Sequence, residues 1–366
     1  MSVMIKDQLE NLTLSHYERA QNDSSVHVKR VRGVIVNEHD KVVCSSFGYT
    51  PEYVVEEDRS SYESMLQSIS DCTVYRSEEG TLLRLFFNDG RWMVSTHKRI
   101  NAFLSRWSSK KSFGELFLEA LEYFFVHGDG KGLIEFENQD ELFDCFCSTL
   151  DTSLVYTFLV RTNQDTKIVC DAPDHPTLFF AGAFKEQKRI KDVTTMIPTP
   201  LQLFFSTLSE LEEYVSLMNP FLYQGVMVIL PDDSTCKILH PQYVSYKNIR
   251  GSEPDLTASY MRVRKSDHQL YLFSKMFPSF SQKHVEDQLY HMTRFLHSMY
   301  VRRYIKKVYT MIHPVLFSVL RQAHSWHVLD RVQHIVTMEK MMDIIDEHQS
   351  LYSIYQHYLS LHIPMY

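Results

Sequence analysis

The chain has 366 residues, of which 44% are apolar, 23% charged and 13% aromatic, and its formal net charge is -7. This composition excludes a mostly disordered protein, because so much apolar and ring surface can form a large core. The length suggests two or three domains. Taken alone, the negative charge also argues against a nucleic-acid-binding protein.

No apolar stretch reaches 18 residues, and the first residues lack the apolar core of a signal peptide. We therefore expect no membrane partner and no secretion. The six cysteines are scattered along the chain, which is typical of free thiols in a reducing compartment. Together these features predict an intracellular protein.

The charge is distributed unevenly. Residues 1–260 carry 37 Asp and Glu against 25 Lys and Arg, whereas residues 261–366 carry 8 against 13 and hold 11 of the 18 histidines. Such asymmetry is typical of a domain boundary and of a module that faces a polyanion. A basic face that is merely solvated is the alternative. We predict two domains, residues 1–262 and 263–366.

Short alternating apolar runs around turn signals predict hairpins before residue 260. The expected strand pairs are residues 34–36 with 42–44, 81–87 with 91–96, 154–160 with 167–170 around a turn at 163–165, and 225–230 with 236–239. The first of these pairs belongs to an N-terminal segment that adds strands to the first domain.

Helical periodicity lies between the hairpins and dominates after residue 280. Ser112 and Glu115 are spaced as a capping box. The expected helices are 112–125, 140–150, 207–218, 282–299, 300–312, 315–324 and, with breaks, 330–360. The fold class predicted is therefore an α+β domain with mainly antiparallel sheets, followed by an all-α domain.

Four sequence segments occur in an order and at spacings that match a known set of motifs. They are YRSEEGTLLR at residues 75–84 running into WMVSTH at 92–97, YTFLVR at 156–161, QGVMV at 224–228, and DSTCKILHPQY at 233–243 followed by IRGSEP at 249–254. The set resembles the adenylyltransferase domain of bacteriophage RNA-ligase-1-type RNA ligases, in the covalent nucleotidyltransferase superfamily. By motif, the resemblance covers roughly residues 70–260. The chain also resembles uncharacterised proteins of large DNA viruses that carry Glu-Gly-Thr in place of Asp-Gly-Ser, which would place it in host cytoplasm or a virion.

The resemblance implies a nucleotidyltransferase fold that uses ATP as substrate together with a bound magnesium ion. It also assigns a role to each of four motifs. In the family, a Lys-x-Asp-Gly-Ser motif supplies the lysine that attacks ATP. A Phe-x-Phe-Glu strand grips the ribose, Glu-Gly-Val helps to hold the metal, and Lys-x-Lys neutralises phosphate charge. This chain departs from most of these positions. In the first motif, Ser77 stands at the position of the nucleophilic lysine and Glu79 at that of the Asp. Arg161 replaces the Glu of Phe-x-Phe-Glu, and Gln224 replaces the Glu of Glu-Gly-Val. Lys237 and Leu239 occupy the two lysine positions of Lys-x-Lys.

Loss of the nucleophile removes the covalent step, and the other replacements weaken the handling of charge. We therefore expect a catalytically degenerate RNA-ligase-like protein, with no cofactor, that acts as an RNA-binding or assembly module. One alternative is an active ATP-dependent RNA ligase with a non-standard nucleophile, which would use ATP and magnesium. Another is a protein-interaction subunit of a viral transcription or virion assembly.

Basic side chains in or near the motifs are candidates for contact with RNA phosphates, salt bridges to nearby acids being the alternative. A second group, at residues 299–309, pairs Arg302 with Lys306 and Arg303 with Lys307 at helical spacing between tyrosines, as in single-strand binding platforms. The predicted nucleic-acid-binding residues are Arg76, Lys98, Arg99, Arg161, Lys237, Arg250, Arg302, Arg303, Lys306 and Lys307.

His324 and His327 have the spacing of metal ligands on a helix, and Asp330 follows them. The sequence offers no evident third and fourth ligand beside them. We therefore predict no metal site.

Overall fold

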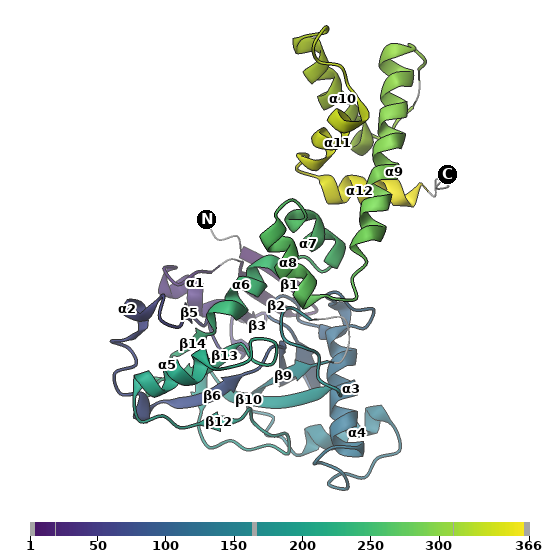
Figure 1. The fold of residues 1–366 in the computed structure, drawn as a ribbon. Helices are drawn as coiled ribbons and strands as arrows, with labels where there is room; N and C mark the ends of the chain where they lie inside the picture. The colour runs from purple at the N-terminus through teal and green to yellow at the C-terminus, as the bar shows by residue number, and fades with distance from the viewer. Residues whose placement is uncertain (1–3, 19, 163–166, 310, 362–366) are drawn as a thin grey trace. The chain divides into compact units, whose positions relative to one another are not determined.

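The computed structural model describes residues 4–18, 20–162, 167–309 and 311–361. By its internal contacts the chain divides between Asn248 and Ile249 into two units. Every strand of the described residues lies in the first unit, and the second is helical (Figure 1). The predicted class, α+β with mainly antiparallel sheets followed by helices, is confirmed.

The N-terminal segment forms a four-stranded antiparallel sheet in chain order. Its strands are β1 (Met4–Leu9), β2 (Leu12–Tyr17), β3 (Arg32–Val36) and β4 (Val42–Cys44), with the short helix α1 (Val26–Arg30) between β2 and β3. Alternate residues Leu12, Leu14 and Ile35 are buried, as a sheet with one covered face requires. The expected pairing of residues 34–36 with 42–44 is confirmed.

A five-stranded sheet follows, in the order β11-β10-β9-β7-β8. Its strands are β7 (Thr81–Asn88), β8 (Arg91–Ser95), β9 (Val155–Arg161), β10 (Thr177–Lys185) and β11 (Lys188–Ile190). The helices α3 (Phe113–Val126) and α4 (Gln139–Ser148) pack on it, and their apolar faces share one core with β7, β9 and β10. The Ser112 capping box at the start of α3 is confirmed, with both of its hydrogen bonds present.

The second five-stranded sheet has the order β12-β6-β13-β14-β5. Its strands are β5 (Glu52–Val54), β6 (Thr73–Ser77), β12 (Gln202–Leu203), β13 (Gly225–Ile229) and β14 (Thr235–Leu239). Only β5 and β14 pair in parallel among the described strands. The helices α2 (Arg59–Tyr62) and α5 (Leu208–Ser216) contribute Tyr62, Leu211 and Val215 to the core on this sheet. The remaining elements of this unit are the short 3-10 turns η1 (Ile69–Asp71) and η2 (Ala102–Leu104) and the helix α6 (Pro241–Arg250), which ends just past the division.

The predicted pairing of residues 154–160 with 167–170 is wrong. Strand β9 pairs with β10 on one side and β7 on the other, and residues 167–170 form no strand. The backbone N–H groups of Ile168, Val169 and Cys170 are directed to the carboxylate of Glu79 instead of to a neighbouring strand. The expected turn at 163–165 lies outside the described residues.

The second unit contains six helices among the described residues. After α7 (Leu256–Val263) and α8 (Asp267–Met276) comes the long α9 (Gln282–Tyr300), which contacts α10 (Pro314–Leu329), α11 (Met338–Asp346) and α12 (Leu351–Ser360). Arg264 ties α7 to α9 and α11 through Glu286 and Asp346. None of the described helices is both long and apolar enough to cross a bilayer.

The predicted helix 300–312 is wrong. Only one π-helical turn, η3 (Val301–Ile305), follows α9, and its backbone bond runs from Lys306 N–H to the Val301 carbonyl. Lys307 then adopts a left-handed backbone with φ of 55°, which ends the helix. The expected i, i+4 basic stripe of Arg302, Arg303, Lys306 and Lys307 is therefore not formed on one helix.

Candidate functional site

A cleft of about 760 Å³ opens between the two five-stranded sheets. Strand β6 pairs with β13 and β13 with β14, so that three motif segments far apart in the sequence meet on one wall of it. The opposite wall comes from β7, β9 and β10. Motif positions Ser77, Gln224 and Lys237 all line the cleft. The structure thus brings these three motif positions to one cleft, whereas Glu79, Arg161 and Leu239 do not line it.

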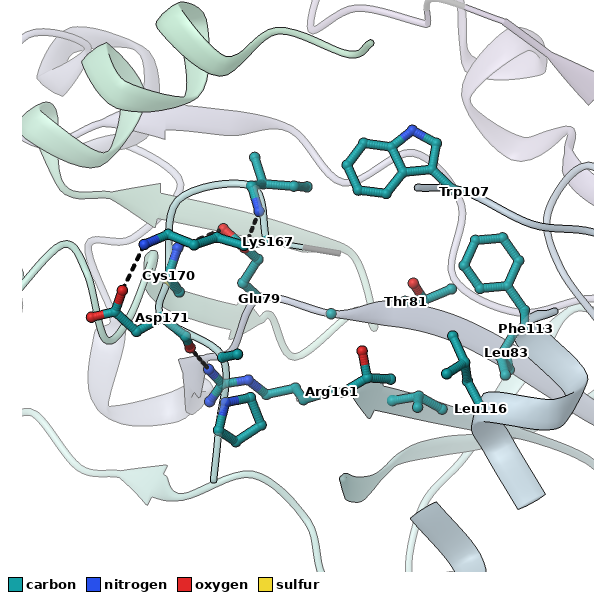
Figure 2. Close-up of a pocket in the computed structure, with 16 residues that line it drawn as sticks. Glu79, Thr81, Leu83, Trp107, Phe113, Leu116, Arg161, Lys167, Cys170 and Asp171 are labelled. Carbon is teal, nitrogen blue, oxygen red and sulfur yellow. Dashed lines mark hydrogen bonds and ion pairs between the residues drawn. The ribbon is translucent and has the colours of Figure 1, made fainter. Parts of the chain in front are cut away.

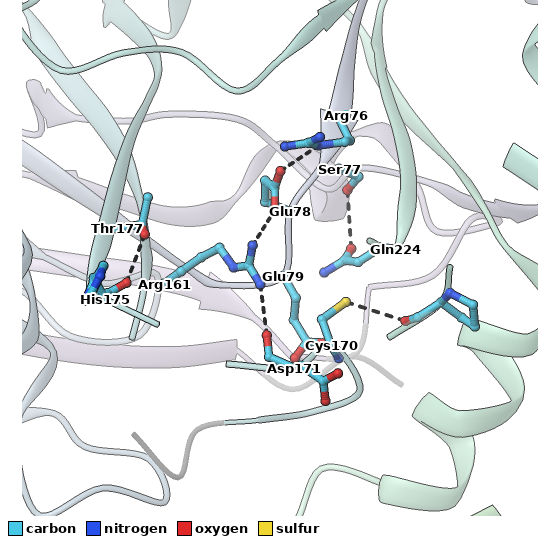
Figure 3. Close-up of polar contacts among 11 residues, drawn as sticks. Arg76, Ser77, Glu78, Glu79, Arg161, Cys170, Asp171, His175, Thr177 and Gln224 are labelled. Atoms are coloured by element: carbon cyan, nitrogen blue, oxygen red, sulfur yellow. Dashed lines mark hydrogen bonds and ion pairs between the residues drawn. The ribbon is translucent and has the colours of Figure 1, made fainter. Parts of the chain in front are cut away.

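Gln224 joins the nucleophile position to the surviving lysine. Its side-chain oxygen accepts a hydrogen bond from Lys237 Nζ at 3.0 Å. The same oxygen accepts a hydrogen bond from Ser77 Oγ at 3.4 Å (Figure 3). Burial lowers the pKa of Lys237 below its ordinary value, and the neighbouring Lys247 and Arg32 act in the same direction. The described contacts of Ser77 include no histidine or carboxylate that could act as a base.

Glu52 on the neighbouring strand β5 lies opposite Lys237 in the parallel ladder. Burial by itself would raise the pKa of Glu52, but the charges of Lys237 and Lys247, together with the 2.5 Å hydrogen bond from Lys247 Nζ, bring it below its ordinary value. The negative charge of Glu52 therefore offsets part of the positive charge at this end of the cleft.

Glu79 is almost fully buried and lines a smaller neighbouring cavity instead of the cleft. Its carboxylate accepts hydrogen bonds from the backbone N–H groups of Ile168, Val169 and Cys170 at 2.9 to 3.2 Å. The hydroxyl of Tyr243 donates a further bond at 3.2 Å. With five bonds on two oxygens, this carboxylate fixes the chain at residues 168–170 and has little capacity left for a ligand.

Glu78, which holds no role in the family motif, is the centre of a charged cluster. Its buried carboxylate accepts from Arg76 Nε at 2.9 Å and from Arg161 Nη1 at 2.6 Å (Figure 3). Arg161 also donates to the Asp171 carbonyl at 3.1 Å, and the guanidinium of Arg76 lies 3.9 Å from the centre of the Tyr223 ring. Arg161, where the family has its ribose-binding Glu, is therefore a neutralised structural cation.

The two motif glycines keep the role of allowing close approach. A Cβ atom on Gly80 would lie 2.6 Å from the Val160 carbonyl oxygen, and one on Gly225, at a φ of 145°, would lie 2.1 Å from that of Ile238. Only glycine fits such contacts. Leu239, at the second lysine position, is 1% exposed and belongs to the interior of the sheet, so no cation stands there.

The predicted cationic residues are dispersed. Arg76, Lys98 and Lys237 line the cleft, and Lys98 also pairs with Glu18 at 2.7 Å. Arg99 pairs with Asp7 at 2.8 Å and does not line the cleft. Arg161 lines a smaller, neighbouring cavity of about 220 Å³ (Figure 2).

The candidates of the second unit do not form a platform. Arg250 is fully buried, where it donates to the carbonyls of Glu253 and Pro254 and to the hydroxyl of Ser259, so the prediction that it contacts nucleic acid is wrong. The guanidinium of Arg303 lies 4.8 Å from the centre of the Phe317 ring. Arg302, Lys306 and Lys307 are exposed.

The sequence patterns missed Arg32 from β3 and Trp107, which line the cleft. His97 and Arg106, which are basic residues in or near the first motif, line it as well. Arg84 is fully buried and donates to the carbonyls of Gly33 and Thr96, while its Nε has no hydrogen-bond partner among the described residues. Arg32 and Trp107 lie outside the four motif segments, so no motif pattern marked them.

The neighbouring histidines respond to these cations. Burial lowers the pKa of His97 well below its ordinary value, and the charges of Arg32 and Arg84 lower it further. Burial, with Lys98 and Arg32, likewise lowers the pKa of His16 to about 4. Both rings are therefore neutral at pH 7, and the positive charge of this end rests on the arginines and Lys98.

Within the described residues, no three His, Cys, Asp or Glu side chains are grouped so that they could hold a metal ion. The predicted candidates have other contacts. The ring of His324 stacks on Tyr304 with centroids 3.9 Å apart, and His327 contacts the His334 carbonyl at 2.6 Å.

Three curated viral proteins are similar in sequence. The chain is 24% identical over 331 residues to "Immediate-early protein ICP-46 homolog" of Invertebrate iridescent virus 6, with 84% of this chain and 70% of that protein covered. It is 26% identical over 269 residues to the protein of the same description in Invertebrate iridescent virus 3, covering 71% and 57%. It is also 26% identical over 202 residues to "Immediate-early protein ICP-46" of Frog virus 3, covering 51% and 49%.

No protein-family model matches the chain. Among solved structures, it is similar to a putative ATP-dependent DNA ligase from Aquifex aeolicus, with a TM-score of 0.42, 12% identity, and 75% of this chain and 73% of that chain covered. An archaeal ATP-dependent RNA ligase gives a TM-score of 0.41 at 10% identity, with 78% and 71% covered. The similarity of this chain to known proteins is thus distant, both to viral immediate-early proteins and to ligases.

Proposed function

We propose that this protein binds RNA through its phosphates in the cleft between the two sheets and does not transfer adenylate through the motif position occupied by Ser77. The observation that carries the proposal is a cleft lined by cations in which the motif position of the nucleophile holds none. Ser77 and Gln224 bond to each other there, where the family that the sequence resembles has a lysine and a carboxylate.

A serine at this position is a weak substitute for the lysine. A hydroxyl needs an adjacent base to become a useful nucleophile, whereas Ser77 Oγ donates to the amide oxygen of Gln224. Arg76 cannot replace the lysine either, because a guanidinium stays protonated. These contacts support binding without the covalent step.

The residues present do not fit the magnesium ion that the resemblance implies. The side-chain oxygen of Gln224, at the position of the metal-holding Glu, already accepts from the Lys237 ammonium group and from Ser77. A cation 3.0 Å from that oxygen opposes a second cation there. We therefore assign no step of the function to a bound metal.

Binding is expected to depend on salt. Arg32, Arg76, Lys98 and Lys237 line the cleft and can neutralise phosphates, each contact adding about 0.9 to the slope of log affinity against log salt concentration on duplex nucleic acid and about 0.7 on single strands. Fluorescence anisotropy of a labelled oligoribonucleotide at several salt concentrations tests this. Binding that is absent, or that does not weaken with salt, contradicts the proposal.

A second function, adenylate transfer with a relocated amine, is favoured by one observation. Lys237 Nζ and Ser77 Oγ contact the same oxygen atom, so Lys237 presents an amine beside the position that lost one. Burial lowers the pKa of Lys237, as a nucleophilic lysine requires. In this reaction the amine nitrogen would bond to the α-phosphorus of ATP, the bond to the pyrophosphate oxygen would break, and the amine proton would pass to solvent.

Incubation with α-labelled ATP, followed by a denaturing gel, separates the two functions. We expect no label on the wild-type protein. A label that Lys237→Arg abolishes would establish the second function instead. Ser77→Lys serves as the matched variant: since Gln224 and Leu239 remain, we expect it to stay unlabelled as well.

A further inference from the structure

The smaller cavity and the cleft share one wall. Trp107 and Phe113, which flank the start of α3, line both hollows, and so do Gly80 and Thr81 at the start of β7. Trp107 belongs to the connection between η2 and α3, and its side chain is half-buried. A molecule bound across this wall would therefore occupy both hollows at once.

The small cavity has one apolar and one polar side. Figure 2 shows the rings of Trp107 and Phe113 with Leu116 on one side, and Arg161 and Lys167 on the other. At about 220 Å³ it is smaller than the roughly 300–1,000 Å³ of a drug-sized pocket. A flat ring with polar edges fits this cavity, because its face can pack on the aromatic side and its edge can hydrogen-bond to the polar side.

The polar side carries donors and acceptors at its rim. Lys167 Nζ donates to Asp171 at 2.6 Å, and Arg161 donates to the Asp171 carbonyl, so these groups are held in place before any ligand arrives. The hydroxyl of Thr81 lies between the two sides (Figure 2). Such an edge can hydrogen-bond to the exocyclic groups of a nucleobase.

The cleft supplies the charge that a nucleotide needs next to its base. Arg106, adjacent to Trp107, lines the cleft together with Arg76 and Lys98. An aromatic ring beside a cationic groove is the arrangement by which proteins bind single strands, with bases stacked on rings and phosphates beside cations.

From this arrangement we infer that the small cavity is a base-binding pocket, in which one base of a single-stranded RNA stacks on Trp107 while its phosphates lie in the cleft. The inference rests on the proposed function, because it assumes that RNA occupies the cleft. It adds Trp107, which lies between the first and second motifs, to residues of those two motifs that also line the cavity.

The test compares two probes by fluorescence anisotropy: a short labelled oligoribonucleotide and an abasic ribose-phosphate chain of the same length. We expect Trp107→Ala to weaken binding of the first about 10-fold and to leave binding of the abasic chain unchanged, because only the stacked base is lost. Phe204→Ala is the matched control, since Phe204 is 83% exposed and lines neither hollow. Its affinity for both probes should equal that of the wild type.

The outcomes separate the inference from the proposed function. If Trp107→Ala binds the oligoribonucleotide as tightly as the wild type, or loses affinity for both probes equally, the base pocket is wrong while binding in the cleft stands. If the wild-type protein binds neither probe, the proposed function fails and the pocket with it. Thermal unfolding followed by circular dichroism shows whether each variant is folded.

Discussion

A carboxylate kept at a motif position can acquire a new task, as Glu79 illustrates. It bonds to three consecutive backbone N–H groups and to the Tyr243 hydroxyl, so it organises the chain at residues 168–170. These bonds are charge-assisted and buried, which makes them stronger than bonds between neutral groups.

We predict that Glu79→Ala lowers the free energy of unfolding by about 2–4 kcal/mol, because it leaves several buried donors without a partner. Urea denaturation measures the change, and hydrogen exchange should quicken at Ile168, Val169 and Cys170. Glu213→Ala, on the exposed side of α5, is the control and should change stability little. Unaltered exchange at the three amides would contradict the role given to Glu79.

The depressed pKa of His16 predicts a pH dependence of stability. The unfolded chain binds a proton at His16 near pH 6.5, whereas burial, Lys98 and Arg32 keep the folded ring neutral until about pH 4. Stability is therefore lost as the pH falls from 7 toward 4. Since the ring is partly exposed, we expect His16→Asn to reduce the loss between pH 7 and pH 5 by roughly 1 kcal/mol.

Urea denaturation at the two pH values measures this difference. His39→Asn is the control, because the side chain of His39 is 80% exposed. Equal losses in the wild type and in His16→Asn would show that His16 is not a source of the pH dependence.

At this scale the sequence predicts which positions meet but not what they bond to. Ser77, Gln224 and Lys237 were placed together by motif order alone. Of the partner residues, Glu52 lies outside the motif segments, and Glu78 and Tyr243 lie inside them at positions with no assigned role. Their contacts depend on three-dimensional distances that no spacing reveals. The burial of Arg250 was missed because its helix is basic in sequence but packs its guanidinium on Ser259 and on carbonyls.

Among the elements, α3 has the clearest local sequence signal, the capping box at its start, and this signal allows a specific prediction. Ser112 is buried and both bonds of its capping box are formed with Glu115. We expect Ser112→Ala to cost about 1 kcal/mol of the free energy of unfolding, measured with urea. Ser109→Ala, just outside the helix, should cost less; a cost as large as that of Ser112→Ala would argue against a specific cap.

Hairpins with tight turns were predictable, and those joined by long connections were not. The β7–β8 turn at Asp89 and Gly90 has positive φ at both residues, which a local signal can specify. Strand β9 was found, but its partner β10 begins 16 residues later, and the apolar run at 167–170 was nearer in sequence. The prediction of a helix at 300–312 was wrong for a different reason. Lys307 adopts a left-handed backbone that ends the helix, and no glycine or proline at that point signals the end in the sequence.

For the whole molecule, the uneven charge suggested that RNA binding belongs to the basic C-terminal part. The structure leaves Arg302, Lys306 and Lys307 exposed but not aligned on one helix. We therefore predict that changing all three to Gln leaves the affinity for the oligoribonucleotide within about twofold, whereas Arg32→Gln combined with Lys98→Gln lowers it about 10-fold or more at low salt. Anisotropy titrations measure both. A larger loss in the triple variant would move the binding site to the helical unit.

The strand order of the sheet β12-β6-β13-β14-β5 has a consequence for how the chain is made. Strand β6 is synthesised at residues 73–77, but both its neighbours lie beyond residue 200. At about 5–20 residues per second, the nascent strand waits on the order of ten to thirty seconds for a partner. During that interval its unpaired edge and the apolar side of β5 are open to chaperones or to other chains. Production of this protein in a foreign host should therefore be limited by events on the ribosome more than by the stability of the finished fold.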